Sequence, residues 1–88
     1  MNEANVGKVI SEISGNIDKS KELSNKMNEL FKEQTELHEQ IMAIDPTKDI
    51  EKFKELNDKY ILLTDSINEL IEKDTEIVSD SLSKIREI

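Results

Sequence analysis

The sequence predicts an all-α fold: an antiparallel two-helix hairpin with coiled-coil-like packing that dimerises into a four-helix bundle. Three observations indicate this fold. Apolar residues recur at alternating steps of three and four on both sides of the chain centre. The only proline of the 88 residues stands near that centre. Hydrophobic residues make up 35% and aromatic residues 3% of the chain, too few to fill a thick globular core.

The chain before the proline shows the clearest heptad pattern. One series with a spacing of seven is Leu23, Leu30, Leu37 and Ile44. A second series, lying between its members, is Met27, Gln34 and Ile41. With leucine at the d positions, the second series occupies the a positions of a helical seam. The first arm of the hairpin is therefore expected over about 16–44.

The stretch upstream of these heptads predicts a change of frame. Apolar residues continue there as Val6, Ile10, Ile13 and Ile17. Joining the two frames takes two successive steps of three, through Ser20 to Leu23, which is a stammer that overwinds a coiled coil. Because Gly15 and Asn16 stand just before it, residues 1–15 are expected to fray or to form a separate short helix.

The chain after the proline predicts a second helix over about 50–88. Its heptad series are Phe53, Tyr60 and Ile67, and Leu56, Leu63 and Leu70. The first series then reaches the polar residues Asp74 and Ser81. The apolar stripe moves sideways to Ile71, Ile77, Val78, Leu82, Ile85 and Ile88. This drift predicts a straight helix with a period near 3.6 in the second arm.

The turn is predicted at 45–49, where Asp45 precedes Pro46. Proline lacks the N–H that a helix interior needs and disfavours helical geometry in the residue before it, so the first helix must end near Ile44. Proline also suits the first position of a helix, and aspartate is a good N-cap. We therefore expect Asp45 and Pro46 to end one helix and begin the next within one domain, 1–88.

Three groups of residues are predicted to mediate contacts. The interaction seam is Leu23, Met27, Leu30, Leu37, Ile41, Phe53, Leu56, Tyr60, Leu63, Ile67 and Leu70. The partner-facing flank is Phe31, Met42, Ile61, Ile71, Val78, Leu82 and Ile85. Ser20, Ser24 and Asp74 form a weak polar layer, unless the stripe has drifted and Asp74 points to water. Gln34 is expected opposite Tyr60 as a buried polar pair that sets the register.

The net charge of the chain limits the classes of partner that it is expected to bind. A net charge of −8 argues against binding to nucleic acid or to an anionic membrane surface. Cysteine is absent, which excludes disulfides and thiolate chemistry. No apolar run is long enough for a membrane span and no classical secretion signal begins the sequence, so a cytoplasmic location is expected, with non-classical export left open.

No catalytic, metal-binding or cofactor-binding residue is predicted. His38, the only histidine, has no carboxylate three or four residues away to share a metal. The segment from Asp45 to Leu56 superficially resembles a calcium loop but lacks its sixth-position glycine and its final bidentate glutamate. Without a glycine-rich phosphate loop or a nucleophile motif, an enzyme is not expected.

Two helices alone bury a single seam, so the protein is expected to associate with itself or with another helical protein. The leading function hypothesis is an interaction module: an assembly factor, adaptor or small chaperone. A second is the subunit of a helical polymer, because the layout resembles needle subunits of bacterial type III secretion systems, although Asp49 stands where their turn would place a second proline. A third is an acidic inhibitor or antitoxin-like protein that binds a basic protein.

Overall fold

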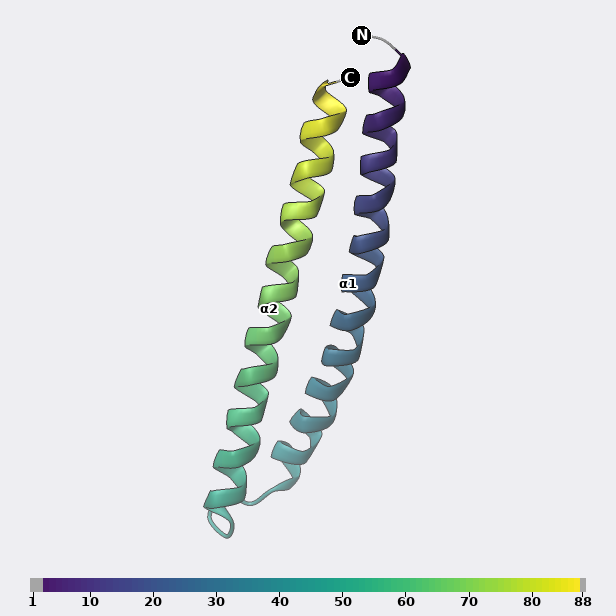
Figure 1. The fold of residues 1–88 in the computed structure, drawn as a ribbon. Coiled ribbons are helices and arrows are strands. Elements are labelled where there is room, and N and C mark those ends of the chain that lie inside the picture. The colour runs from purple at the N-terminus through teal and green to yellow at the C-terminus, as the bar shows by residue number, and fades with distance from the viewer. Residues whose placement is uncertain (1–2, 88) are drawn as a thin grey trace.

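The computed structural model describes the backbone of residues 3–87 and the side chains of residues 5–87. Two helices, α1 (Glu3–Ala43) and α2 (Ile50–Glu87), lie side by side and run in opposite directions (Figure 1). The hairpin measures 70 × 15 × 12 Å. The described part of the chain contains no strand. The predicted all-α antiparallel hairpin is therefore confirmed.

Helix α1 is continuous through Gly15 and Asn16. From Glu3 onward it shows neither the frayed segment nor the separate short helix expected within residues 1–15, whose first two members lie outside the described residues, as does Ile88. A glycine in a helix interior costs about 1 kcal/mol relative to alanine. Packing against α2 on both sides of this position, at Ile13 and Asn16, offsets that cost.

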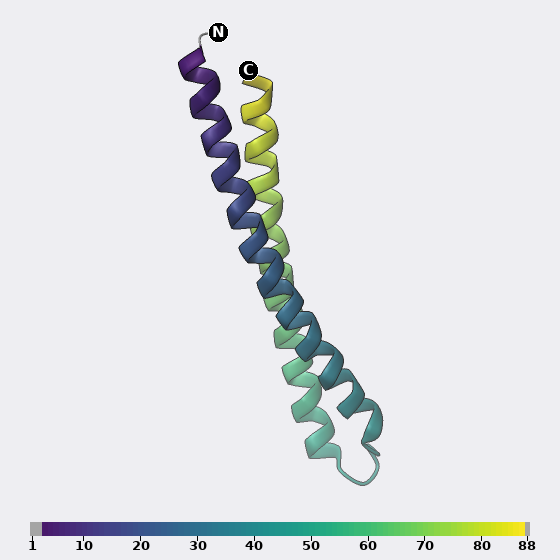
Figure 2. The ribbon, with the colours of Figure 1, turned by 90° about the vertical axis from the view of Figure 1, so that its right-hand side faces the viewer.

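The inward-facing residues follow one heptad frame along both helices. In α1 and directly after its end they are Val6, Val9, Ile13, Asn16, Ser20, Leu23, Met27, Leu30, Gln34, Leu37, Ile41 and Ile44. In α2 they are Phe53, Leu56, Tyr60, Leu63, Ile67, Leu70, Asp74, Ile77, Ser81 and Lys84. We call this contact the seam. A constant seven-residue frame requires the helices to wrap around each other, and α1 crosses α2 partway along the hairpin (Figure 2).

The predicted stammer in α1 and the predicted sideways drift in α2 are wrong. Ile10 and Ile17 are 57% and 50% exposed, and the seam runs through Val9 and Asn16 instead. In α2 the polar Asp74 stays in the seam. Polar residues are tolerated there because they bond across the two helices, whereas a change of frame would overwind one helix against the other.

The connection between the helices is built by Asp45. Its carboxylate accepts hydrogen bonds from the amide of Thr47 at 3.0 Å and from the hydroxyl of Thr47 at 2.6 Å. These two bonds stabilise the charged form and lower the pKa of the Asp45 carboxyl. The Asp45 carbonyl also accepts the amide of Asp49 at 3.1 Å. The result is a single closed turn that carries Pro46.

Helix α2 is capped by Asp49 rather than by Asp45. The Asp49 carboxylate accepts the amide of Lys52 at 3.1 Å, and its carbonyl accepts the amide of Phe53 at 3.1 Å. This is the geometry of an N-cap residue. Pro46 thus ends α1, as predicted, but does not begin α2. The prediction failed there because Asp45 uses its side chain to close the turn, which leaves the cap to the next aspartate.

Candidate interaction surface

The residues predicted as the interaction seam lie between α1 and α2 and hold the hairpin together. All of them are at least half-buried, but only Leu56 and Ile67 are fully buried, at 2% and 4% exposure. A partner cannot reach them without separating the helices. A surface for binding must therefore lie on the outer sides of the hairpin.

The exposed hydrophobic residues gather on one outer side. In one heptad frame, Leu23 of α1 and Leu56 of α2 both stand at position d. The exposed hydrophobic residues then occupy positions e and b of both helices, and among the described residues the exception is Leu62, at position c. The members are Ile10, Ile17, Phe31, Met42, Ile50, Ile61, Ile71, Val78, Leu82 and Ile85. Residues of both helices at these positions line one common groove, so the two rows share one side. We call this side the apolar face.

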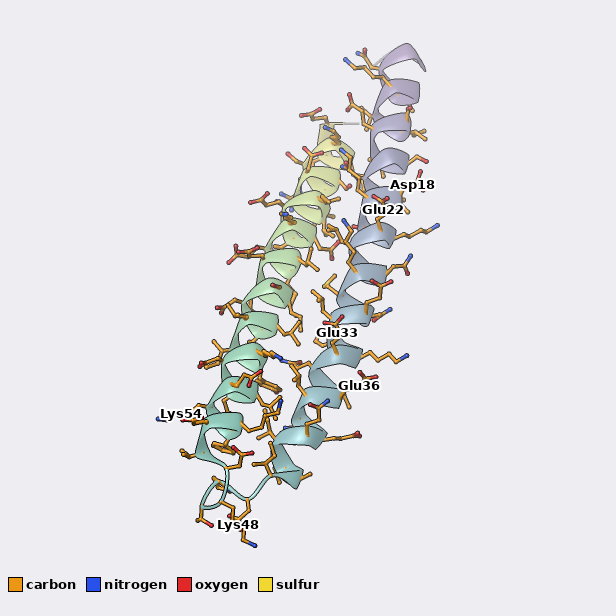
Figure 3. The ribbon with its side chains drawn as sticks, turned by 60° about the horizontal axis from the view of Figure 1, so that its bottom comes forward. Asp18, Glu22, Glu33, Glu36, Lys48 and Lys54 are labelled. Carbon is orange, nitrogen blue, oxygen red and sulfur yellow. The ribbon has the colours of Figure 1, made fainter. Side chains whose placement is uncertain are left out.

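Charge is excluded from the apolar face almost completely. Within residues 5–87, positions e and b of the helices carry no aspartate or glutamate, and their lysines are Lys21 and Lys54. The remaining outer positions hold the acidic residues; Figure 3 shows several along α1, which are Asp18, Glu22, Glu33 and Glu36. The net charge of −8 is therefore carried by the other sides of the hairpin.

A groove of about 580 Å³ lies on the apolar face in the half of the hairpin away from the turn. Ile17, Val78 and Leu82 are among its lining residues, together with Ser20 and Asp74. The Ser20 hydroxyl donates to the Asp74 carboxylate at 2.6 Å across the seam. Both residues are half-buried, so Asp74 does not simply point to water.

The third member of the predicted polar layer, Ser24, is exposed and also lines the groove. The structure thus places all three predicted residues around one groove and joins two of them, Ser20 and Asp74, by a hydrogen bond. The layer interrupts the apolar seam between Leu23 and Ile77. A partner that covers the groove would cover this layer with it.

The predicted pairing of Gln34 with Tyr60 needs correction. The Gln34 amide donates to the hydroxyl of Thr64 at 2.8 Å, and this hydroxyl donates in turn to the Tyr60 carbonyl of its own helix at 3.0 Å. Tyr60 instead lies beside His38, with ring centroids 6.3 Å apart. The polar contact therefore sits one helical turn farther along α2 than the predicted register placed it.

A second polar cluster, not predicted, lies near the ends of the hairpin. The Asn16 amide donates to the Asp80 carboxylate at 2.9 Å and to the Ser81 hydroxyl at 3.0 Å. Lys84 forms ion pairs with Asp80 at 3.2 Å and with Glu12 at 3.3 Å. Asn16 stands at a point where the first helix was expected to fray or begin, and so it was not included in the predicted seam. Extending the heptads from Leu23 and Leu70 toward the ends would have placed Asn16 and Lys84 in the seam.

This cluster predicts a pH dependence. The hydrogen bond from Asn16, followed by that from Lys84, lowers the pKa of Asp80, and bonds to Asp80 and Glu12 raise the pKa of Lys84. The Asp80 contribution to stability is present above its unfolded pKa of about 3.9 and is lost as the pH falls through its lowered value. The Lys84 contribution is present below about 10.4 and is lost as the pH rises through its raised value.

The variant Lys84→Gln should therefore melt below the natural chain near neutral pH, and the difference should vanish toward both extremes. Thermal unfolding followed by circular dichroism from pH 2 to 12 measures it. Lys73→Gln is the matched control, because Lys73 is an exposed lysine on the same helix. An equal and pH-independent effect in both variants would contradict the assignment.

Neither a metal site nor a membrane span is found among the described residues. Among the described residues, no three histidine or carboxylate side chains are grouped so that they could hold a metal ion. Neither α1 nor α2, over the residues described, includes a segment with the length and apolarity of a membrane span. Comparison of the chain with protein-family models, curated proteins and solved structures finds no match.

Proposed function

We propose that the chain is a non-enzymatic protein–protein interaction module, of the assembly-factor, adaptor or small-chaperone kind, that acts through its apolar face. The supporting observation is the segregation of exposed hydrophobic residues from acidic ones on the two helices. Large contiguous apolar patches are rare on monomeric proteins and typically mark binding surfaces. Here the apolar residues extend from Ile10 to Met42 on α1 and from Ile50 to Ile85 on α2.

The mode of binding follows from the geometry. The seam is already occupied, so a partner packs its own helices across the apolar face without separating α1 from α2. Residues at positions e and b would then become core residues of a larger helical bundle, and the acidic residues would stay in solvent. The energy of binding comes mainly from apolar burial, at about 25 cal/mol per Å².

A photo-crosslinking amino acid placed in the chain within cells of the source organism tests this proposal. We expect Leu82→p-benzoylphenylalanine to form a covalent product with a protein partner, because Leu82 lies on the apolar face. The matched control is the same replacement at Leu62, the exposed hydrophobic residue off that face. Both positions are exposed on α2, so they differ mainly in the side they occupy.

A crosslinked product at position 82 supports the proposed function whether the partner is another protein or a second copy of the chain. Products at neither position, or equal products at both, would overturn the proposal. The mass of the product, read by denaturing electrophoresis and mass spectrometry, separates a self-complex from a complex with another protein.

A further inference from the structure

We infer that the occupant of the apolar face is a second copy of this chain, placed with its turn beside the turn of the first, so that the dimer is a four-helix bundle. This inference rests on the proposed function and specifies its partner. Three independent features of the hairpin carry it: the surface that it exposes, the distribution of its charges and the heights of its apolar residues.

The hairpin exposes enough surface for a stable interface with a second copy. A compact monomer of 10.1 kDa exposes roughly 5,300 Å² by the scaling of surface with mass, whereas this hairpin exposes 6687 Å². The excess is roughly 1,400 Å². A copy lying along a face of 70 by 15 Å covers roughly 1,000 Å² of each chain, which falls within the range of stable interfaces.

The charges favour this side for self-association over every other side. Two chains that each carry a net charge of −8 repel one another when their acidic sides approach. Positions e and b of the helices, which make up the apolar face, carry no acidic side chain within residues 5–87, and their lysines are Lys21 and Lys54. Two copies that meet face to face therefore keep their carboxylates directed away from the interface, apart from Asp74, which lines the groove from the seam.

The positions of the apolar residues along the long axis of the hairpin, which we call their heights, indicate how the second copy is oriented. Pairs bonded across the seam, such as Asn16 with Asp80 and Ser20 with Asp74, show which residues of α1 and α2 lie at one height. By this register Ile17 lies level with Val78. A two-fold axis along the hairpin places Ile17 of one copy opposite Val78 of the other, so apolar residues meet.

The alternative axis runs across the hairpin and reverses one copy. With that axis at the height of Ile71, Val78 would lie opposite Thr64 and Ile85 opposite Asn57, so apolar residues would meet polar ones there, although Ile17 would lie opposite Phe31. The parallel placement of the turns therefore buries more apolar surface against apolar surface, and it does so in the half of the hairpin that holds the 580 Å³ groove.

Cysteine crosslinking tests the arrangement directly, because the natural chain has no cysteine. We mix the single variants I17C and V78C, treat the mixture with a short bismaleimide and identify crosslinked peptides by mass spectrometry. The expected product joins position 17 of one copy to position 78 of another. A mixture of V78C with T64C is the matched control for the reversed arrangement, and abundant product there with none in the first mixture would overturn the orientation.

Light scattering during size-exclusion chromatography tests the partner itself. The expected molar mass is about 20 kDa. The dimer should be as stable or more stable at higher salt concentration, because salt screens the repulsion between two acidic chains. Leu82→Glu should raise the dissociation constant of the dimer roughly tenfold or more, and Leu62→Glu should leave it nearly unchanged. A monomer at every concentration would overturn the second copy as the partner, while crosslinks from position 82 to another protein would still uphold the proposed function.

Discussion

Replacing Ile67 with alanine lowers the melting temperature by roughly 10 °C or more. Ile67 and Leu56 are the buried residues among those described, so each supplies a large part of a very small core. Truncation of a buried isoleucine to alanine costs about 2–5 kcal/mol through lost burial and the cavity that remains. In a domain of this length each kcal/mol shifts the melting temperature by roughly 4–8 °C.

The measurement is thermal unfolding followed by circular dichroism at 222 nm, at one fixed protein concentration, because association would make the midpoint depend on concentration. Leu62→Ala is the matched control: Leu62 is 65% exposed on the same helix, and its truncation should change stability by less than about 0.5 kcal/mol. Similar losses in both variants would show that the seam is not the structural core.

The fold could be predicted from the sequence where the seam is apolar. Leucine at three d positions of α1, and the matching series from Phe53 to Leu70, indicate the helical period without ambiguity. Pro46 placed the break because proline cannot continue a helix. The start of α2 was harder, since Asp45 and Asp49 are both competent caps and the choice between them depends on which one closes the turn with Thr47.

The half of the hairpin toward the chain ends could not be read in the same way. There the apolar residues leave the seam, and polar residues such as Asn16, Ser20 and Ser81 take their places. A search for apolar periodicity follows the hydrophobic residues and so predicted a stammer that is absent. The heptad frame instead continues from the half near the turn, because both helices keep their regular geometry once they are paired there. Hydrogen bonds across the seam, which apolar periodicity does not reveal, hold the same frame.

Seven of the ten residues of the apolar face were predicted as an outer flank, but their gathering on one side was not. Phe31, Val78 and Leu82 were expected on the outside as a flank for a partner. Ile10 and Ile17 also lie on this side, but this can be predicted only when one heptad frame is known for both helices. The reason is that a residue moves from the seam to the apolar face when the frame shifts by one position. Sidedness is thus a property of the paired helices rather than of either helix alone.

Replacing Asp74 with leucine raises the melting temperature, by roughly 4–8 °C for a gain of about 1 kcal/mol. Asp74 is half-buried in the seam, where leucine would add apolar contact and has the better helix propensity. Ser20 loses its acceptor, but a serine hydroxyl inside a helix can donate to the carbonyl four residues earlier. Asp65→Leu is the matched control, because Asp65 is an exposed aspartate of the same helix and should gain only a few tenths of a kcal/mol from propensity.

The dissociation constant of the same Asp74→Leu variant shows whether the polar layer of Ser20 and Asp74 lies within the dimer interface. In the dimer that we infer, the two copies of Asp74 approach the two-fold axis at the same height, so their like charges oppose association and removal of both should lower the dissociation constant. Stability that rises together with tighter association would make Ser20 and Asp74 a weak layer within the interface. Stability that rises with unchanged association would make the layer a poorly packed part of the seam and place it outside the contact between copies. A lower melting temperature would mean that the Ser20–Asp74 hydrogen bond stabilises the hairpin more than leucine packing can.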